Sequence, residues 1–281
     1  MICADIHYVR PDTAEEAVEA WRRLPGARYL AGGTEILSSA RRTAAYELRA
    51  CIDIKRIPET VRHEIREGRI HLGAALALSD VAEGEAFPLL NAVLRGIADR
   101  TVRNRLTLGG NVAGLLPYRE AVLPLLLADA TVLTLAPGAE DAPPVRRERR
   151  LRDVFDKRLV LAPGELLLSF SVPMEATEWP WSHQRRTRTS VVDYPLATTA
   201  LVRDGEAIRF AVTGVHPYPF RSDAIDAALT EGVQTGAPLT LGGVESILEA
   251  LGALRADSRG SAEYRAALVK KMILTSLEEL A

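Results

Sequence analysis

Thr101-Val-Arg-Asn-Arg-Leu-Thr-Leu-Gly-Gly-Asn111 is the stretch of sequence that decides the fold. It contains a glycine pair, Gly109-Gly110, with Thr107 before it and Asn111 after it. Adjacent glycines lack Cβ atoms, so the backbone can take a positive φ and a ligand can lie directly on the main chain. Successive N–H groups in such a turn can converge on an anion such as phosphate. A tight turn without a ligand is the alternative interpretation.

A second glycine pair favours the phosphate interpretation. Tyr29-Leu-Ala-Gly-Gly-Thr-Glu-Ile36 places Gly32-Gly33 between a short buried strand, Arg28–Leu30, and a helix that begins near Ile36. Free N–H groups and the helix dipole favour an anion at such a turn. The chain has no G-x-G-x-x-G and no G-x-x-x-x-G-K-S/T motif, which argues against a Rossmann or P-loop protein. The two glycine turns therefore predict one extended ligand with several phosphates, held from both sides.

Taken together, the two motifs resemble the paired FAD-binding motifs in the flavin subunit of molybdenum hydroxylases. Residues 30–35 and 103–111 carry the resemblance, and weaker matches extend it over nearly the whole chain. The family includes the FAD subunits or domains of xanthine dehydrogenase, bacterial carbon monoxide dehydrogenase and related aldehyde or nicotinate enzymes. The resemblance implies an α+β fold of the vanillyl-alcohol-oxidase-like, PCMH type: a two-lobed FAD-binding domain followed by a small α+β domain. That second domain would have a three-stranded antiparallel sheet with helices on one face.

The resemblance also implies FAD as the cofactor and assigns residues to it. The first motif would wrap the pyrophosphate with Leu30, Ala31, Gly32, Gly33, Thr34, Glu35 and Ile36. The second motif would complete the cradle near the ribityl chain and phosphates with Thr107, Gly109, Gly110 and Asn111. A diphosphate needs many N–H donors more than it needs lysines, and glycine turns supply them.

Side chains outside the two motifs are assigned in the same way. Glu120 stands where the family usually has an aspartate, and its longer side chain retains an acceptor for a sugar or ribityl hydroxyl. Tyr194 falls where the family places an aromatic side chain near the isoalloxazine ring, with an ordinary strand residue as the alternative. Arg185 or Arg186 replaces a family lysine, and either could stabilise negative charge on a reduced flavin. No acid or base residue is expected, because the flavin carries the chemistry.

The family resemblance implies an FAD-carrying electron-transfer subunit of a molybdenum hydroxylase complex. A molybdopterin-binding large subunit would oxidise the substrate, and a small subunit with 2Fe–2S clusters would relay electrons to this FAD. The flavin would then reduce NAD⁺ or another acceptor. Two alternatives stay open: a self-sufficient small flavin oxidoreductase, and a non-catalytic scaffold subunit whose flavin site has decayed. Glu120 in place of aspartate is the only feature that supports the scaffold.

Composition and charge limit the other classes of protein. The 281 residues can form two domains, and 47% hydrophobic with 26% charged residues is typical of a globular protein. The net charge of −2 gives no general attraction to nucleic acid or an anionic membrane. The N-terminus lacks the basic start and apolar run of a signal peptide, and residues 121–136 are too short and interrupted to span a bilayer. We therefore expect a cytoplasmic protein.

Cysteine and histidine give no sign of a metal or disulfide site. Cys3 and Cys51 set no disulfide framework and cannot hold an iron–sulfur cluster by themselves. The five histidines show no metal-ligand spacing, and no hydrolase motif occurs.

Two domains are expected from the pattern along the chain. An FAD-binding domain spans 1–173, with a small βαβ-like lobe at about 1–58 and a larger mixed lobe at about 59–173. A C-terminal domain spans 180–281, because Trp179-Pro-Trp181 marks a change in composition. The expected elements include a helix with a Thr13–Glu16 capping box, a hairpin over 61–72, a helix over 87–98, and strands over 128–135 and 166–172.

The C-terminal domain is expected to open with a hairpin over 196–215 and to close with helices near 222–229, 244–254 and 261–280. Helical spacing in the last of these predicts a buried side made of Tyr264, Leu268, Met272, Leu277 and Leu280.

A run of arginines lies over residues 146–152. A docking patch for a partner subunit is one interpretation, and a nucleic-acid contact is another. We favour a solvated loop edge, because no aromatic residues are interleaved with the charges.

Overall fold

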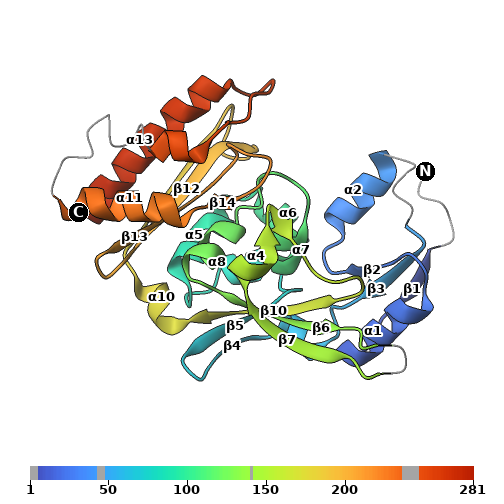
Figure 1. Ribbon diagram of the computed structural model, residues 1–281. Coiled ribbons are helices and arrows are strands. Elements are labelled where there is room, and N and C mark those ends of the chain that lie inside the picture. The colour runs from blue at the N-terminus through green and yellow to red at the C-terminus, as the bar shows by residue number, and fades with distance from the viewer. Residues whose placement is uncertain (1–5, 43–47, 140–141, 236–246) are drawn as a thin grey trace. The chain divides into compact units, whose positions relative to one another are not determined.

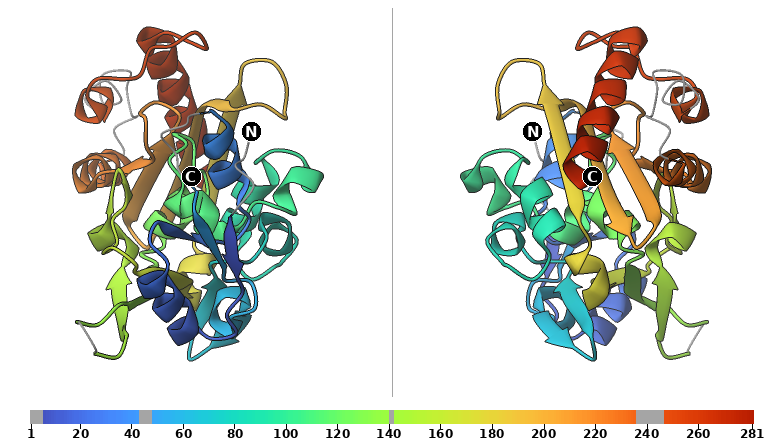
Figure 2. Two further views of the ribbon diagram at one scale, coloured as in Figure 1. Left: turned by 90° about the vertical axis from the view of Figure 1, so that its right-hand side faces the viewer. Right: turned by 90° about the vertical axis from the view of Figure 1, so that its left-hand side faces the viewer.

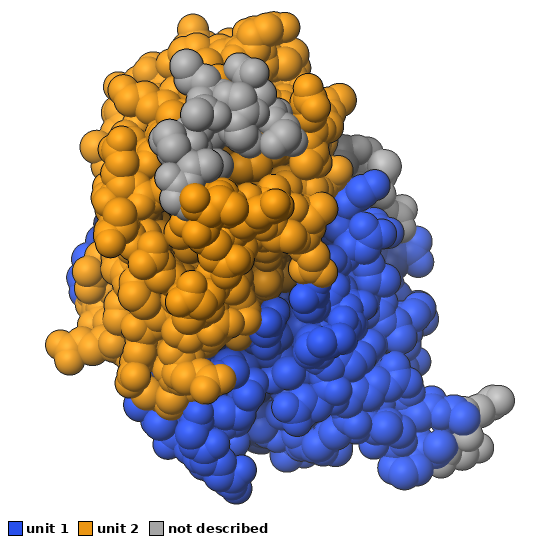
Figure 3. All heavy atoms as spheres, turned by 60° about the vertical axis from the view of Figure 1, so that its left-hand side comes forward, with its two compact units in different colours: residues 1–81, 100–114, 129–173 blue, residues 82–99, 115–128, 174–281 orange. Residues whose placement is uncertain are grey.

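The computed structural model describes residues 6–42, 48–139, 142–235 and 247–281 (Figure 1). The chain divides into two compact units, each made of segments that are discontinuous in the sequence (Figure 3). The first unit lies within residues 1–81, 100–114 and 129–173, and the second within 82–99, 115–128 and 174–281. Because a compact unit need not be a domain, the domain limits expected from the sequence stay a prediction.

A three-stranded parallel sheet forms the N-terminal part of the first unit. Its strands are β1 (His7–Val9), β2 (Ala27–Leu30) and β3 (Ala50–Asp53), in the order β1-β3-β2. Helix α1 (Ala14–Arg23) connects β1 to β2, and α2 (Thr34–Arg42) follows β2. The expected capping box is confirmed: the Thr13 hydroxyl accepts from the Glu16 amide, and the Glu16 carboxylate accepts from the Thr13 amide.

An antiparallel five-stranded sheet forms the rest of the first unit, in the order β4-β5-β10-β6-β7. Its strands are β4 (His63–Arg66), β5 (Arg69–Gly73), β6 (Thr131–Ala136), β7 (Val145–Arg150) and β10 (Leu166–Pro173). Short elements complete the unit: α3 (Pro58–Val61), α6 (Arg100–Arg103), α7 (Leu108–Ala113), α9 (Leu151–Val154), β8 (Phe155–Asp156) and β9 (Arg158–Leu159). Helix α4 (Leu78–Ala82) ends the segment 1–81. Apolar residues of α1 pack in one cluster with residues of β3, β6 and β10, so this helix joins the two sheets.

Several elements of the first unit differ in bounds or type from those expected from the sequence. Val61 ends helix α3, so the predicted hairpin begins only at His63. Ala128 caps the preceding helix, and the strand after it begins at Thr131. Residues 146–150 of the arginine run lie in the edge strand β7 and not in a loop, because their backbone pairs with β6, and Leu151 and Arg152 begin helix α9.

The arginines of β7 are matched by acidic groups. Arg149 pairs with the buried carboxylate of Glu165, and Arg146 lies 2.8 Å from a Glu59 oxygen. The edge strand therefore carries charges that its own unit largely compensates.

A four-stranded antiparallel sheet is the centre of the second unit (Figures 1 and 2). Its strands run β11 (Trp181–Thr187), β12 (Pro195–Asp204), β13 (Ala207–Thr213) and β14 (Phe220–Arg221), so the predicted three strands are joined by a short fourth. Helices α11 (Asp223–Gln234) and α13 (Ala262–Leu280) pack on one face through a large apolar cluster. Helices α5 (Pro88–Arg95) and α8 (Val122–Leu127) also contact this sheet, and α10 (Met174–Glu178) precedes β11.

The face of the four-stranded sheet opposite α11 and α13 differs from the expectation that helices cover only one face. Thr198 bonds Glu120, and the Arg209 guanidinium bonds the carbonyl of Leu127, both on the sheet face opposite the α11–α13 cluster. The sheet is thus covered on both faces, not on one, because the segment 115–128 belongs to this unit.

The buried side of α13 is also different from the expected one. Met272 and Leu280 are buried as predicted, but Tyr264 is 52% exposed and Arg265 is completely buried. The Arg265 guanidinium finds acceptors inside the unit, which makes burial of a charged side chain possible.

Two other expected helices also differ from the structure. The helix expected over 87–98 is shorter, because α5 ends at Arg95, and the short helix α6 follows at Arg100. The first residues of the helix expected over 244–254 lie outside the described part of the chain. Within the rest of that range, residues 247–251 are helical.

Among the described residues, no helix combines the length and the apolar character needed to cross a membrane.

Candidate functional site

The first glycine turn connects β2 to α2 and has the geometry of an anion seat. Gly33 takes a φ of +70°, the left-handed region that favours glycine. Its carbonyl accepts the Leu37 amide at 2.9 Å, so intrahelical hydrogen bonding begins there and the preceding amides lie at the open helix end. No described residue accepts a hydrogen bond from the amides of Gly32, Gly33, Thr34 or Ile36. These groups are therefore available to a phosphate.

The second glycine turn uses its amides differently. Thr107 caps α7, and its hydroxyl accepts the Gly110 amide at 3.3 Å. The amides of Leu108 and Gly109 donate to backbone carbonyls within residues 74–76, at 3.0 and 2.8 Å. The N–H groups at this turn are thus occupied by the protein itself. The expectation that both turns supply free donors is corrected. The first turn has free amides, while the amides of Leu108 and Gly109 at the second turn bind the backbone of residues 74–76.

Three close approaches within the first unit involve residues of the two motifs, and the first of them joins the motifs directly. A Cβ atom on Gly32 would lie 2.0 Å from the carbonyl oxygen of Arg105. A Cβ on Gly109 would lie 2.6 Å from the Cβ of Ala74, and a Glu35 carboxylate oxygen lies 2.5 Å from the position of a Gly114 Cβ. No side chain fits at the first two positions without movement. The glycines let segments seventy residues apart in the sequence come together.

All of the predicted residues of the two motifs lie in this first unit. Thr107 and Gly109 are buried, Gly110 is exposed, and Asn111 is partly buried and has partners within the fold. The first motif, residues 30–36, is partly buried throughout, as a surface that holds a ligand should be.

Glu120 lies in the second unit and takes part in a buried ion pair. One of its oxygens accepts from Arg185 Nε at 2.9 Å and from the Thr198 hydroxyl at 2.8 Å. Burial raises the pKa of Glu120, and the Arg185 guanidinium opposes this effect. Arg186, the other candidate for the family lysine, is exposed. Of the two arginines, Arg185 therefore has the internal role.

Tyr194 is also in the second unit and stacks on Tyr118, which the sequence analysis did not single out. Their ring centroids are 4.7 Å apart, with 17° between the planes. Tyr118 is buried while Tyr194 is 52% exposed. The Arg259 guanidinium donates to the Tyr194 carbonyl at 2.6 Å, and Arg185 donates to the preceding carbonyl at the same distance. The aromatic ring is thus presented on a fixed backbone, a relation that only the tertiary structure reveals.

Another residue that the sequence analysis missed contacts the first glycine turn. The Lys55 ammonium donates to the carbonyl of Ala31 at 3.0 Å. No spacing rule pointed to Lys55, because it follows a different strand, β3.

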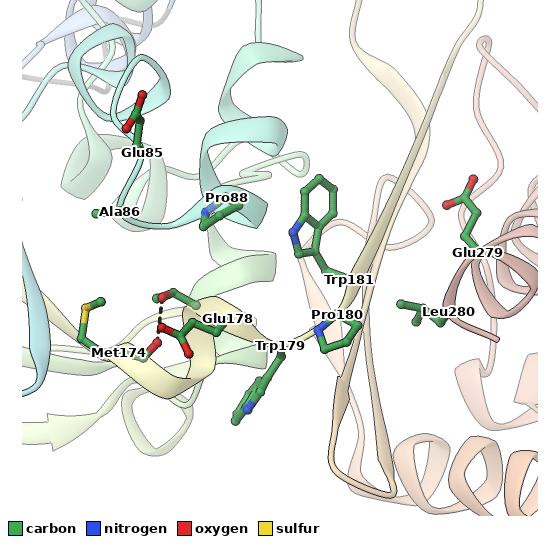
Figure 4. A pocket seen from close by; sticks show the side chains of 11 residues that line it. Glu85, Ala86, Pro88, Met174, Glu178, Trp179, Pro180, Trp181, Glu279 and Leu280 are labelled. Atoms are coloured by element: carbon green, nitrogen blue, oxygen red, sulfur yellow. Dashed lines mark hydrogen bonds between the residues drawn. The ribbon is translucent and has the colours of Figure 1, made fainter.

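The second unit has a hollow of about 540 Å³ (Figure 4). It is lined by Trp179 and Trp181, whose indoles point in different directions, and by the carboxylates of Glu85, Glu178 and Glu279. Three acidic side chains would repel a phosphate. This hollow is therefore unsuited to the charged part of a dinucleotide, and the first glycine turn suits it well.

The strand, glycine turn and helix of the first unit present open amides at a helix start, a geometry suited to an anion such as a diphosphate. The model of the family described as the FAD binding domain in molybdopterin dehydrogenase matches residues 4–175. This match covers both glycine motifs and more than half of the chain. The chain belongs to this family, and FAD is its cofactor.

Relatives along the full length support the assignment. The glyceraldehyde dehydrogenase medium chain of Sulfolobus acidocaldarius is 25% identical, covering 99% of each chain. The carbon monoxide dehydrogenase medium chain of Hydrogenophaga pseudoflava is 27% identical, covering 99% of this chain and 97% of the relative. The xanthine dehydrogenase FAD-binding subunit of Escherichia coli O157:H7 is 24% identical, covering 97% and 94%.

Solved structures agree with the sequence comparison. Carbon monoxide dehydrogenase from Hydrogenophaga pseudoflava superposes with a TM-score of 0.82 at 28% identity, covering 99% of this chain and 98% of that one. Quinoline 2-oxidoreductase from Pseudomonas putida 86 shares the fold, with a TM-score of 0.79 at 22% identity. The chain is thus an FAD-binding oxidoreductase subunit of the molybdenum hydroxylase type, as the motifs indicated.

Proposed function

We propose that this chain is the electron-transfer subunit of a molybdenum hydroxylase complex. In this proposal a partner with a molybdopterin cofactor oxidises the substrate, and a second partner with 2Fe–2S clusters delivers the electrons. The observation that carries the proposal is the first glycine turn, whose unoccupied amides are held against the second motif in one compact unit. Full-length relatives described as medium chains of carbon monoxide and glyceraldehyde dehydrogenases support it.

FAD, when bound, supplies the ability to accept electrons and to pass them to an acceptor such as NAD⁺. The work of the chain is to bind and orient the cofactor. The amides of residues 32–36 would hold the pyrophosphate, with the Thr34 hydroxyl beside them. Asn111 and Glu120 would offer polar groups to the ribityl chain, and Tyr194 would offer its ring to the isoalloxazine.

The first experiment is reconstitution of the purified chain with FAD. The protein is mixed with FAD and desalted, its visible spectrum is recorded, and the cofactor released by heating is identified. Retained flavin bands support the proposal, and a folded but colourless protein contradicts it for the isolated chain.

Glycine variants make this experiment specific. Gly33→Val and Gly110→Val should both lose the flavin, because Gly33 has a positive φ and a Cβ on Gly110 would lie 2.7 Å from the Thr107 hydroxyl oxygen. Gly68→Val is the matched control: Gly68 has a φ of +69° in the same unit, but no atom lies within 4 Å of its Cβ position. This variant carries the same backbone strain and should retain FAD.

Partners and acceptor need separate measurements. If the chain acts in a complex, a tagged chain purified from its own cells should carry molybdenum and iron in constant ratio to flavin. If NAD⁺ is the acceptor, NADH should bleach the flavin band of the complex without oxygen. Flavin with neither metal would favour the self-sufficient oxidoreductase, and metals without flavin would favour the scaffold.

A further inference from the structure

The end of strand β3 carries a chain of polar contacts that leads to the first glycine turn. Asp53 is the last residue of β3, the central strand of the parallel sheet, and its side chain is only 5% exposed. One of its oxygens accepts from the Tyr8 hydroxyl at 2.5 Å and from the Lys55 ammonium at 2.8 Å. Its other oxygen accepts the Lys55 amide at 3.0 Å. The carboxylate therefore holds Lys55 at both its backbone and its side chain.

Electrostatics keeps this carboxylate charged. Burial raises the pKa of Asp53, but the Lys55 ammonium and the Tyr8 hydroxyl outweigh it, and the pKa lies below the ordinary value. The charged carboxylate fixes the ammonium of a lysine whose side chain remains 38% exposed. Lys55 is thus a cation whose backbone and ammonium are both held by Asp53, while part of its side chain stays accessible to a ligand.

The position of the ammonium connects it to the cofactor site. Lys55 Nζ donates to the carbonyl of Ala31, the residue immediately before Gly32. This bond occupies the carbonyl oxygen that precedes the open amides of Gly32, Gly33 and Thr34. An unpaired carbonyl next to those amides would repel a phosphate, whereas an ammonium attracts it. The same contact fixes the chain just before the turn at Gly33.

We propose that Lys55 is a positioning residue of the FAD site, held by Asp53, that orients the first glycine turn and adds a full positive charge to the partial charges that the amides offer the diphosphate. This inference rests on the proposed binding of FAD at that turn. It concerns the diphosphate in particular, because amides alone provide only partial charges. The variant Lys55→Gln removes the positive charge of the ammonium and leaves an amide N–H donor on a shorter side chain.

The experiment measures FAD affinity by the change in flavin fluorescence, for the full chain at several salt concentrations. Lys55→Gln should weaken FAD binding by about tenfold or more, the usual consequence of losing one charge-assisted contact. Its affinity should also depend less steeply on salt than that of the wild type, because one cation is missing from the site. ADP, which carries a diphosphate without a flavin, should lose affinity as a competitor by a similar factor.

Control variants separate charge from folding. Lys55→Arg retains the charge and should recover most of the affinity. Lys271→Gln removes the same charge from an exposed position on α13 and should bind FAD as the wild type does. Tyr8→Phe removes one partner of Asp53 but leaves the bond from Lys55 to Ala31, so its affinity should stay close to wild type.

Each result has a distinct meaning. A wild-type chain that binds no FAD would overturn the proposed function together with the role of Lys55. A wild type that binds FAD, with Lys55→Gln equal to it in affinity and salt dependence, would overturn the role of Lys55 alone. Weaker FAD binding with an unchanged salt dependence and unchanged ADP affinity would also overturn it, since the lost contact would then not be one to the diphosphate.

Discussion

The carbonyl oxygen of Arg105 lies 2.0 Å from the position that a Cβ atom on Gly32 would occupy. This distance is far shorter than any contact between carbon and oxygen, so only glycine allows the two chain segments to meet here. Gly32 belongs to the turn with open amides, and Arg105 belongs to the segment that leads into the second glycine pair. The two motifs are therefore one structural unit, although some seventy residues separate them in the sequence.

Gly32→Ala should abolish FAD retention, because the added methyl group must push the first turn away from Arg105. The effect is steric, since the φ of Gly32 lies outside the left-handed region. FAD retained after desalting, with the melting temperature of the apoprotein measured in parallel, checks this expectation. Gly260→Ala is the matched control, because its Cβ would meet only ordinary contacts at 3.4 and 3.5 Å. Full flavin content in Gly32→Ala would show that the turn can move without loss of function.

The ion pair between Arg185 and Glu120 should stabilise the second unit. Arg185→Met leaves a buried carboxylate with only the Thr198 hydroxyl as a partner among the described residues, and it also releases the carbonyls of Val191 and Asp193. Breaking a buried pair from one side costs about 3 kcal/mol or more of unfolding free energy. Urea denaturation followed by circular dichroism measures this loss.

The neighbouring arginine provides the comparison for that measurement. Arg186 is exposed, so Arg186→Met should change the unfolding free energy by less than about 0.5 kcal/mol. Equal losses in the two variants would mean that the buried ion pair contributes no more than a surface charge.

Local features of the chain made the first glycine turn predictable. A strand, a glycine pair and a helix start follow each other within residues 27–42, and the sign of φ at Gly33 depends mainly on the residue itself. The Thr13 capping box was predictable for the same reason, because both of its hydrogen bonds span three residues.

Features that depend on distant segments were not predictable. The amides of Leu108 and Gly109 look free in the sequence, but the backbone of residues 74–76 occupies them. The arginines of β7 suggest a loop by composition, yet pairing with β6 and the acidic groups of the same unit make them a strand. In both cases a tertiary contact overrides the local pattern.

Arg265 illustrates the same limit and gives a third prediction. Its guanidinium donates to the carbonyls of Leu196 and Gly214 and to the carboxylate of Asp257, the last two at 2.8 Å. Arg265→Met should lower the unfolding free energy by about 3 kcal/mol or more, because these acceptors would be buried without a donor. Thermal and urea denaturation measure the effect.

Tyr264 is the natural reference for Arg265. It precedes Arg265 on α13 and was expected on the buried side, but it is 52% exposed. Tyr264→Ala should therefore cost less than about 1 kcal/mol. A larger loss for Tyr264→Ala than for Arg265→Met would contradict the orientation of the helix.

His183 should make the stability of the protein depend on pH. It lies on β11, and burial lowers its pKa to about 4 with a smaller contribution from the Arg185 charge. Because the ordinary value is 6.5, the unfolded chain binds a proton between pH 6.5 and pH 4 while the folded chain does not. Protons then favour the unfolded state, so stability falls as the pH decreases through this window. From pH 7 to pH 5 the contribution of His183 amounts to about 2 kcal/mol.

His183→Gln removes this titration and should flatten the stability curve by that amount between pH 7 and pH 5. Urea denaturation at both pH values gives the difference directly, because carboxylates that titrate in the same window contribute equally to both proteins. His63→Gln serves as the control, since His63 is exposed on β4. Its curve should run parallel to that of the wild type. If the curve of His183→Gln is also parallel, the protonated side chain of His183 must be accommodated in the folded state, and the low pKa would be wrong.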